Sequence, residues 1–305
     1  MRYKMYQLSF PQAVHLGERS LDEALSTFCA DTLFSALYQE ALKAGGDFAD
    51  WLYHSAADGK LLLSDAFPYI GNTYYLPKPM IRPEIKDTQG DSVVKKAFKK
   101  LKYIPINKMK DYMAGELDAQ LENAAMKSFT KSYLKTSAAI PDGEDTRPYH
   151  VGTVTFGEGS GLYIITAAET EEDEKRLCEL INMLSFAGIG GKRASGLGRF
   201  TIVKERAMKS LNFERDSEWK MSLSISLPGD EELDEALADA RYQIKKRSGY
   251  VASSTYAPEN RKKKDLFMFA AGSCFRKSFK GDIYDVSDGG AHPVYRYGKP
   301  LFWAL

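Results

Sequence analysis

A glycine-rich segment from Phe186 to Phe200 (FAGIGGKRASGLGRF) constrains the fold of this 305-residue chain more than any other feature. Five of its glycines, at 188, 190, 191, 196 and 198, fall within eleven residues, and glycine is unfavourable inside a helix or a strand. An apolar stripe at helical spacing precedes the segment and a β-prone run follows it: Leu177, Leu180, Ile181 and Leu184, then 200–203. The segment is therefore predicted to be a loop that joins a helix, ended by Gly188, to a strand.

This loop has the composition of an anion-binding site. Glycine allows positive φ and brings amide N–H groups close to a ligand, and the segment adds a hydroxyl and three cations: Ser195, Lys192, Arg193 and Arg199. It is not a nucleotide P-loop, which would need glycine at 186 and Ser or Thr at 193, nor a dinucleotide fingerprint, because it precedes a strand. We interpret it as a cradle for backbone phosphates; a surface turn is the alternative.

The N-terminal two-thirds of the chain predict one βαββαβ unit of the ferredoxin-like kind, interrupted by a long insertion. Asp31 is expected to cap the first helix, Gly45-Gly46 to end it, and Thr170–Asp173 to form a capping box at the second. The expected elements are strand 3–10, helix 31–42, strand 60–63, strands 149–156 and 161–166, a helix from 170 to 188 and strand 200–203. Prolines break the rhythm between about 65 and 148, which predicts the insertion.

A second unit of the same kind is expected to begin near Ser210. Lys220–Leu227 (KMSLSISL) alternates apolar residues with serine at period two, the clearest strand pattern in the chain. Asp230 can cap a helix, and 266–271 predicts a further strand. The sequence therefore predicts an α+β fold of two ferredoxin-like (RRM-like) βαββαβ units. The first is 1–209, with the insertion at about 65–148 and the glycine-rich loop 188–198; the second is 210–305.

Charge and cysteine content narrow the class of protein. The chain has 42 Lys and Arg against 41 Asp and Glu, so its net charge of +1 marks neither a nucleic-acid nor a membrane protein. Positive charge is nevertheless concentrated, with ten Lys against four acids in 95–135 and eleven basic residues against two acids in 241–280. Three distant cysteines fit neither a zinc site nor a disulfide framework. Without a signal peptide or an apolar run of about 20 residues, a soluble cytoplasmic protein is expected.

Several short stretches, together with the glycine-rich loop, carry a resemblance to a known family. They are Ala13–Gly17, Asp31–Leu37, Asp65–Tyr69, Leu76–Pro79, Lys246–Val251, Gly272–Phe275 and His292–Tyr297. The loop resembles that of the RAMP superfamily of CRISPR proteins, where it lies late in a ferredoxin-like domain. The ordered set of stretches resembles the subunit-four family of type III-A (Csm) complexes, whose members cap the crRNA 5′ end.

The resemblance implies a non-catalytic subunit without a cofactor. In this family one copy binds the 5′ handle of crRNA and joins the backbone RAMP subunit to the large polymerase/cyclase-like subunit in antiviral defence. A thumb-like hairpin wedges between crRNA and target RNA, and by position it falls within about Phe129–His150. The residues that we expect to bind RNA are His15, Gly17, Gly188, Gly190, Gly191, Lys192, Arg193, Ser195, Gly196, Gly198, Arg199, Arg147, Lys246 and Arg247.

His15 is the main candidate for catalysis. Some RAMP relatives cleave pre-crRNA with a histidine, so a metal-independent endoribonuclease that uses His15 as a general acid or base is the alternative function. No second titratable partner can be assigned to His15, and His54, His150 and His292 lack the spacing of metal ligands. We therefore assign no catalytic and no metal-binding residue. A protein–protein adaptor is a third possibility, and Arg247 is equally compatible with RNA contact and with a solvated turn.

Overall fold

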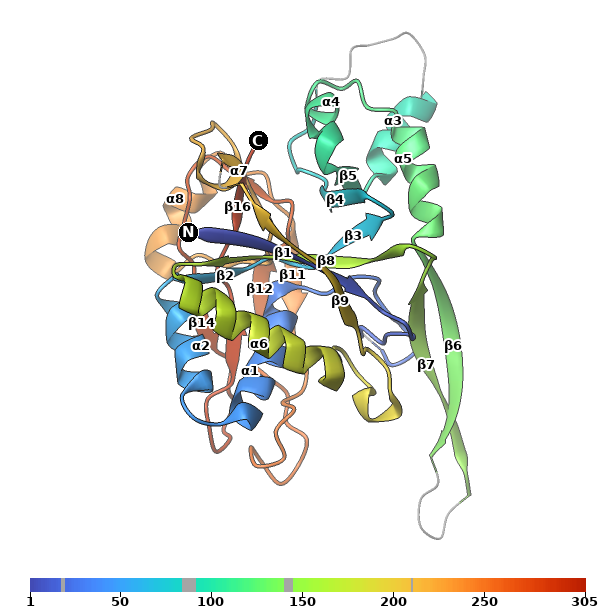
Figure 1. Ribbon diagram of the computed structural model, residues 1–305, viewed down its shortest axis with the longest axis vertical. Helices are drawn as coiled ribbons and strands as arrows, with labels where there is room; N and C mark the ends of the chain where they lie inside the picture. Colours follow the sequence, from blue (N-terminus) through green and yellow to red (C-terminus); the bar gives the residue numbers. More distant parts are fainter. Residues whose placement is uncertain (18–19, 84–91, 140–144, 210) are drawn as a thin grey trace.

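The computed structural model describes residues 1–17, 20–83, 92–139, 145–209 and 211–305, and its centre is a seven-stranded antiparallel sheet (Figure 1). The strand order is β5-β4-β3-β8-β1-β9, with β2 also paired to β8. Two helices, α1 (Ala30–Ala44) and α6 (Glu171–Ala187), cover one face, and α2 (Phe48–Ala57) lies beside α1. The strands are β1 (Arg2–Ser9), β2 (Leu61–Leu63), β3 (Phe67–Ile70), β4 (Thr73–Pro77), β5 (Tyr103–Pro105), β8 (Ser160–Ala168) and β9 (Thr201–Met208).

The central strands have the order of a βαββαβ unit. β9, β1, β8 and β2 lie side by side, α1 follows β1, and α6 follows β8. Gly45, with φ of 74°, ends α1. Thr170 and Asp173 form the capping box expected at the start of α6. The two predicted helices of this unit are confirmed, although α1 begins one residue earlier and ends two residues later than predicted.

The insertion predicted at about 65–148 is wrong at its start. β3 pairs with β8 and β4 pairs with β3, so residues 67–77 belong to the sheet. The prolines do not exclude strands here. Within β3 only Tyr69 and Ile70 pair with β4, so Pro68 lies beyond that ladder, and Pro77 is the last residue of β4. The rest of the segment forms a hairpin and a helical lobe. The lobe contains α3 (Ser92–Lys100), α4 (Met109–Met113) and α5 (Ala119–Ala125), with 3₁₀ turns at Ile106–Lys108 and Met126–Ser128.

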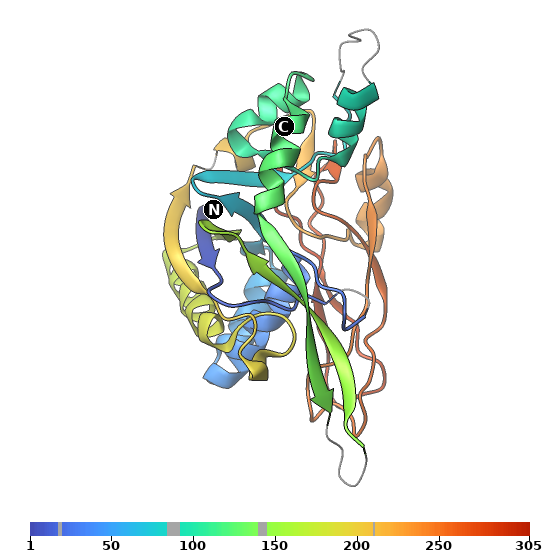
Figure 2. The same ribbon diagram turned by 90° about the vertical axis from the view of Figure 1, so that its right-hand side faces the viewer.

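A long β-hairpin projects from the body of the molecule (Figure 2). It is made by β6 (Thr130–Ala139) and β7 (Arg147–Phe156), which pair along their whole length. Much of β6 is exposed, and Leu134 is 65% exposed. The predicted thumb, Phe129–His150, includes β6 and the start of β7, but β7 continues beyond it to Phe156. Residues 140–144 of the predicted thumb lie outside the described residues.

A second βαββαβ unit is not seen in the part of the C-terminal half that the structure describes. This half consists of small antiparallel sheets with the orders β13-β10-β16, β11-β12 and β14-β15. The expectation of two ferredoxin-like units is therefore not confirmed, whereas a mixed α/β fold is. The elements are α7 (Leu211–Glu214), β10 (Lys220–Ser222), a 3₁₀ turn (Asp230–Glu232), α8 (Leu233–Leu237), β11 (Ile244–Arg247), β12 (Leu266–Phe269), β13 (Cys274–Phe275), β14 (Ile283–Asp285), β15 (Tyr295–Tyr297) and β16 (Phe302–Ala304).

The serine-alternating stretch 220–227 differs from its prediction because both of its faces are buried. Ser222, Ser224 and Ser226 have no exposed surface. They form internal hydrogen bonds instead; the Ser224 hydroxyl, for example, donates to the Lys299 carbonyl at 2.9 Å. The alternation therefore separates apolar side chains from hydrogen-bonded polar ones. Only the first three residues of the stretch form strand β10.

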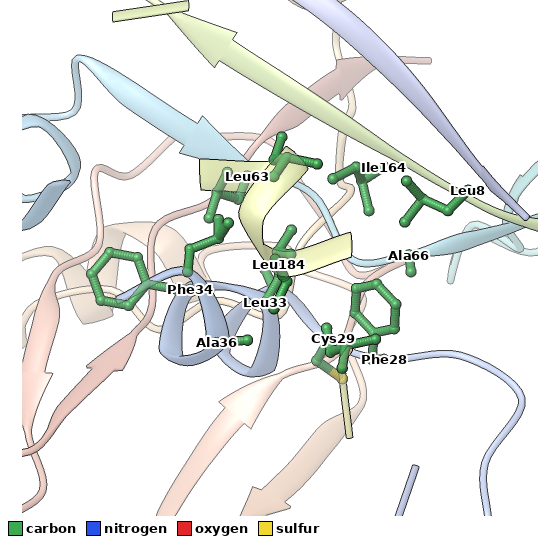
Figure 3. Packing of buried hydrophobic residues seen from close by; sticks show 14 of the residues in the cluster. Leu8, Phe28, Cys29, Leu33, Phe34, Ala36, Leu63, Ala66, Ile164 and Leu184 are labelled. Carbon is green, nitrogen blue, oxygen red and sulfur yellow. The ribbon is translucent and has the colours of Figure 1, made fainter. Parts of the chain in front are cut away.

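Two hydrophobic clusters run through both halves of the chain. The cluster around α1, part of which Figure 3 shows, includes Leu33 and Phe34 together with Ile225 and Met268 of the C-terminal half. A second cluster combines strands β1 and β8 with β10 and β16. Because the halves share their cores, apolar burial fixes their relative position. The predicted boundary at 209/210 stays a prediction, and Ser210 lies outside the described residues.

Candidate functional site

The base of the glycine-rich loop is closed by backbone contacts. The N–H of Ile189 donates to the Gly198 carbonyl at 2.9 Å, and the N–H of Gly198 donates to the Ala13 carbonyl at 3.1 Å. Gly188 and Gly198 are buried, both with φ of 81°, and a Cβ at Gly198 would overlap the Ile189 backbone. These two predicted residues therefore close the base of the loop and do not line the cavity described below.

The middle of the loop lies against His15. The N–H of Gly191 donates to the His15 carbonyl at 2.9 Å, and a Cβ at Gly191 would come within 2.7 Å of the imidazole Cδ2. The imidazole is buried, and its Nδ1 lies 2.6 Å from the Gly152 carbonyl of β7. Because a carbonyl only accepts, Nδ1 carries the proton, and Nε2 next to Gly17 is left for other partners.

A cavity of about 530 Å³ opens between this loop, α1 and the C-terminal half. The face of α1 that carries Thr32, Ser35 and Gln39 forms one wall. The structure therefore brings residues from distant parts of the sequence to one concave surface. Those that were predicted to bind RNA and line it are His15, Gly17, Gly190, Gly191, Arg193 and Arg247.

Three charged side chains form a buried cluster on the cavity wall: Asp31 of α1, Arg247 of β11 and Arg296 of β15. Arg247 donates through Nε–H and Nη2–H to the Asp31 carboxylate at 2.8 Å each, and Arg296 donates through Nη1–H at 2.7 Å. Asp31 and Arg296 are only 4% and 5% exposed. Burial by itself would raise the pKa of Asp31, but the two guanidinium groups outweigh it and hold the pKa below its ordinary value.

This cluster overturns the predicted cap at Asp31 and one of the two alternatives for Arg247. Asp31 does not cap α1: the N-cap position is Cys29, and the Asp31 carboxylate is turned to the arginines instead. Arg247 does not lie in a solvated turn, because it belongs to strand β11 and its side chain is 17% exposed. Both residues connect the N-terminal half to the C-terminal half across more than 200 positions of sequence, which no local pattern could have indicated.

Two more cations, Arg193 and Lys263, line the cavity and make it electropositive. Arg193 donates through Nη2–H to Gln39 Oε1 at 2.8 Å. Burial, and secondarily the nearby Arg296, lower the pKa of Lys263. The lining thus holds four cations and, among the described residues, one acid, Asp31; Glu40, which does not line the cavity, lies 4.0 Å from Arg193. Such an excess of positive charge in a concave site attracts polyanions.

Lys263 and Arg296 were missed by the sequence reasoning. Lys263 lies within the basic stretch 241–280 noted in the sequence, and Arg296 lies between two tyrosines in the short strand β15. Arg296 points to the opposite face of β15 from Tyr295 and Tyr297, because side chains alternate along a strand, so its aromatic neighbours do not indicate that it is buried.

The other predicted residues lie outside the cavity lining. Lys192, at φ 58°, contacts the projecting hairpin: its Nζ lies 4.7 Å from the ring centroid of Tyr149. Lys246 pairs with exposed Asp265 at 2.7 Å, and Arg147 begins β7 in the hairpin. The outer turn of the loop holds the remaining three, Ser195, Gly196 and Arg199.

A second cavity, of about 390 Å³, adjoins the first, and the two share Thr27 and Cys29. Asp65 lies in its wall and is buried. Its Oδ1 accepts hydrogen bonds from the backbone N–H groups of Ala30 at 2.7 Å and Ile225 at 2.8 Å, which ties α1 to the C-terminal half. Burial raises the pKa of Asp65 to about 6 despite these two hydrogen bonds.

Replacing Asp65 with asparagine is expected to stabilise the protein at pH 7.5. Because the folded-state pKa lies above the unfolded one, the aspartate destabilises the fold increasingly as pH rises from about 4 through 6. Asparagine keeps the accepting Oδ1 and removes the buried charge, so we expect a gain of about 1–3 kcal/mol in unfolding free energy at pH 7.5. Urea denaturation at pH 5 and pH 7.5 measures this; a variant that is equally destabilised at both pH values would contradict the assignment.

Two further findings concern metal ions and membranes. In the part of the chain that the structure describes, no three His, Cys, Asp or Glu side chains lie close enough together to hold a metal ion. Among the same residues, no helix combines the length and apolar character needed to cross a bilayer.

The fold and the cavity define the class of the protein: a RAMP-like mixed α/β protein with a glycine-rich loop beside an electropositive cavity. Its fold matches the crystal structure of the Csm3–Csm4 subcomplex in the type III-A CRISPR-Cas interference complex, with a TM-score of 0.68, 18% identity and coverage of 100% of this chain and 99% of that one. It also matches the Csm1–Csm4 cassette in complex with pppApA, with a TM-score of 0.61, 19% identity and coverage of 100% and 98%.

Sequence comparison identifies the particular family. The CRISPR Csm4 C-terminal domain family matches residues 215–305. The chain is 38% identical to CRISPR system Cms protein Csm4 of Mycobacterium tuberculosis (strain CDC 1551 / Oshkosh), covering 100% of this chain and 98% of the relative. It is 36% identical to the Streptococcus thermophilus protein of the same name, covering 100% and 99%. The chain belongs to the Csm4 family, which confirms the resemblance found in the sequence.

Proposed function

We propose that this chain is a non-catalytic RNA-binding subunit of a type III-A CRISPR effector complex and that it holds the 5′ handle of crRNA. The observation that carries the proposal is the cavity of about 530 Å³ on which the loop, His15, Arg193 and Arg247 converge. Its four cations against one acid favour a polyanionic ligand. The backbone N–H groups and hydroxyls around it are the donors that position nucleic-acid backbones.

We further propose that the chain bridges the backbone RAMP subunit and the large polymerase/cyclase-like subunit. This proposal draws on the solved relatives, which are a Csm3–Csm4 subcomplex and a Csm1–Csm4 cassette. In this arrangement the β6–β7 hairpin would lie near target RNA. The contact between Lys192 and Tyr149 would then join the crRNA-holding loop to the hairpin.

We propose no catalytic role for His15. Its Nδ1 is committed to the Gly152 carbonyl, and Asp31, the one carboxylate lining the cavity among the described residues, is committed to two guanidinium groups. A general acid–base pair is therefore not assembled there. Incubating the protein with repeat RNA in EDTA tests this: discrete fragments that disappear with His15→Ala would establish the endoribonuclease instead.

The double variant Lys192→Ala/Arg193→Ala is expected to bind handle RNA at least about tenfold more weakly at 0.15 M salt and to lower the salt slope of binding by about 1–2. Both side chains are solvent-accessible, so the fold is expected to remain stable. Fluorescence anisotropy with labelled repeat RNA across a salt series measures both effects, and RNA that co-purifies with the assembled complex reports retention.

The matched control removes two cations far from the loop. Lys60 and Lys175 are exposed and pair only with surface acids, at 3.0 Å each. Lys60→Ala/Lys175→Ala makes the same change in net charge and is expected to leave RNA affinity close to that of the parent. Equal losses in the two double variants would mean that net charge, and not the cavity, governs binding.

A further inference from the structure

A third cavity, of about 490 Å³, lies at the opposite end of β1 from the glycine-rich loop. Tyr3 lines it near the start of β1, whereas His15 follows the end of that strand. An eight-residue strand is about 25 Å long at ~3.3 Å per residue, and Figure 1 shows β1 crossing the molecule between the two regions. The cavity is therefore separate from the proposed RNA site.

Lys299 is the unusual residue of this cavity. It is only 5% exposed, and among the described residues no carboxylate lies within ion-pair distance of its Nζ. Of the acids that act on it from further away, Asp282 accepts the backbone N–H of Ile283 at 2.7 Å. Asp58 pairs with Lys60 at 3.0 Å, and Glu232 accepts from the backbone N–H groups of Lys280 and Gly281. The stem of Lys299 is buried and burial lowers its pKa, but its Nζ is not among the fully buried unpartnered atoms of the described residues, so the ammonium group is open to the cavity.

Two more lysines face the same cavity, Lys220 and Lys280. The Nζ of Lys220 donates to the Ser278 hydroxyl at 3.2 Å, which leaves the hydroxyl proton available to another acceptor. Aromatic and apolar side chains supply most of the remaining walls, with Tyr3, Phe279 and Phe302 among them, and Asp58, paired with Lys60, is the one acid among the described lining residues. The cavity thus combines three ammonium groups with aromatic and apolar walls.

We propose that this cavity binds a small phosphorylated ligand of nucleoside size. Three ammonium groups and a hydroxyl suit a phosphate, and a phosphate would provide the contact that Lys299 lacks. The volume of about 490 Å³ and the aromatic walls match pockets that enclose a small organic molecule. A single acidic side chain of a partner protein would leave most of that space empty.

The test uses the full chain with inorganic phosphate, adenosine 5′-monophosphate (AMP) and adenosine as probes. We expect AMP and phosphate to raise the melting temperature and adenosine to have little effect. Lys299→Met is expected to weaken AMP binding at least about tenfold by calorimetry. The same variant without ligand is expected to melt at a higher temperature. Methionine has a similar shape, and it removes an ammonium group whose pKa is lowered by burial, that is, whose charged form burial disfavours.

Two further variants make the outcome decisive. The double variant Lys192→Ala/Arg193→Ala is expected to respond to AMP as the parent does, and Lys299→Met is expected to bind RNA as the parent does. The AMP proposal and the RNA proposal can therefore fail independently of each other. Lys220→Met should also weaken AMP binding, and it replaces Lys299→Met in the test if that variant does not fold. The absence of any response to AMP or phosphate overturns the proposal. So does undiminished AMP binding in the folded lysine variants, or loss of AMP binding in the loop variant.

Discussion

Replacing Asp31 with alanine is expected to lower the free energy of unfolding by about 3–5 kcal/mol, because it leaves two buried guanidinium groups facing each other without a counter-charge. Asp31 accepts three hydrogen bonds from Arg247 and Arg296, and these bonds connect α1 to strands β11 and β15. Since folded proteins are stable by only about 5–15 kcal/mol, such a loss removes a large part of the total. Urea denaturation at pH 7.5 measures it.

The matched control for Asp31 is Asp265, an exposed acid directly before β12 that pairs with β11, the strand that carries Arg247. Asp265 pairs with Lys246 at 2.7 Å, with side-chain exposures of 43% and 55%, so Asp265→Ala is expected to cost no more than about 1 kcal/mol. Adding Arg296→Met to Asp31→Ala is expected to restore part of the lost unfolding free energy, because one of the uncompensated charges is then removed. Equal effects of Asp31→Ala and Asp265→Ala would show that the cluster contributes no more than a surface pair.

The two buried aspartates have opposite pH dependences. The pKa of Asp31 lies below its ordinary value, so its contribution to stability is present above that value and is lost as pH falls through the folded-state pKa. The pKa of Asp65 is raised to about 6, so its unfavourable contribution is relieved as pH falls below that value. Asp31→Ala should therefore differ least from the parent in strong acid, whereas Asp65→Asn should differ most above pH 6.

The N-terminal half was predictable because its signals are local. The capping box at Thr170, the apolar stripe of α6 and the glycine after α1 each act within a few residues. The C-terminal half was not, because its short strands are stabilised by the surface that they share with the other half. The buried serines of 220–227 illustrate this, since their partners include the Lys299 carbonyl, 75 positions away from Ser224.

The candidate site was predictable in composition but not in assembly. The glycines and cations of the loop were recognised from residue types alone, and His15 and Gly17 from the stretch that follows the first strand. The sequence could not separate glycines that face the cavity from those that close the loop, because the difference depends on which backbone lies opposite each one. Nor could it pair Asp31 with Arg296, which is 265 positions away.

Gly190→Ala is expected to reduce handle-RNA affinity by at least about tenfold and to lower the unfolding free energy by about 1–3 kcal/mol. Gly190 has φ of 95°, and a Cβ there would overlap the His15 carbonyl and come within 3.1 Å of Leu16. That carbonyl accepts the N–H of Gly191 at 2.9 Å, so the loop must move away from His15. The amides and Arg193 would then no longer share one cavity with Arg247.

Gly46→Ala is the control for Gly190→Ala. It shows the effect of backbone strain at a glycine with positive φ when the glycine-rich loop is not displaced. Gly46 also has positive φ, 59°, but a Cβ there would meet no atom within 4 Å, and the residue does not line the cavity. It is expected to cost about 1 kcal/mol in stability and nothing in RNA affinity. Anisotropy and urea denaturation on both variants give the comparison. If Gly190→Ala loses stability but binds RNA as the parent does, the contact between the loop and His15 maintains the fold and the RNA lies elsewhere.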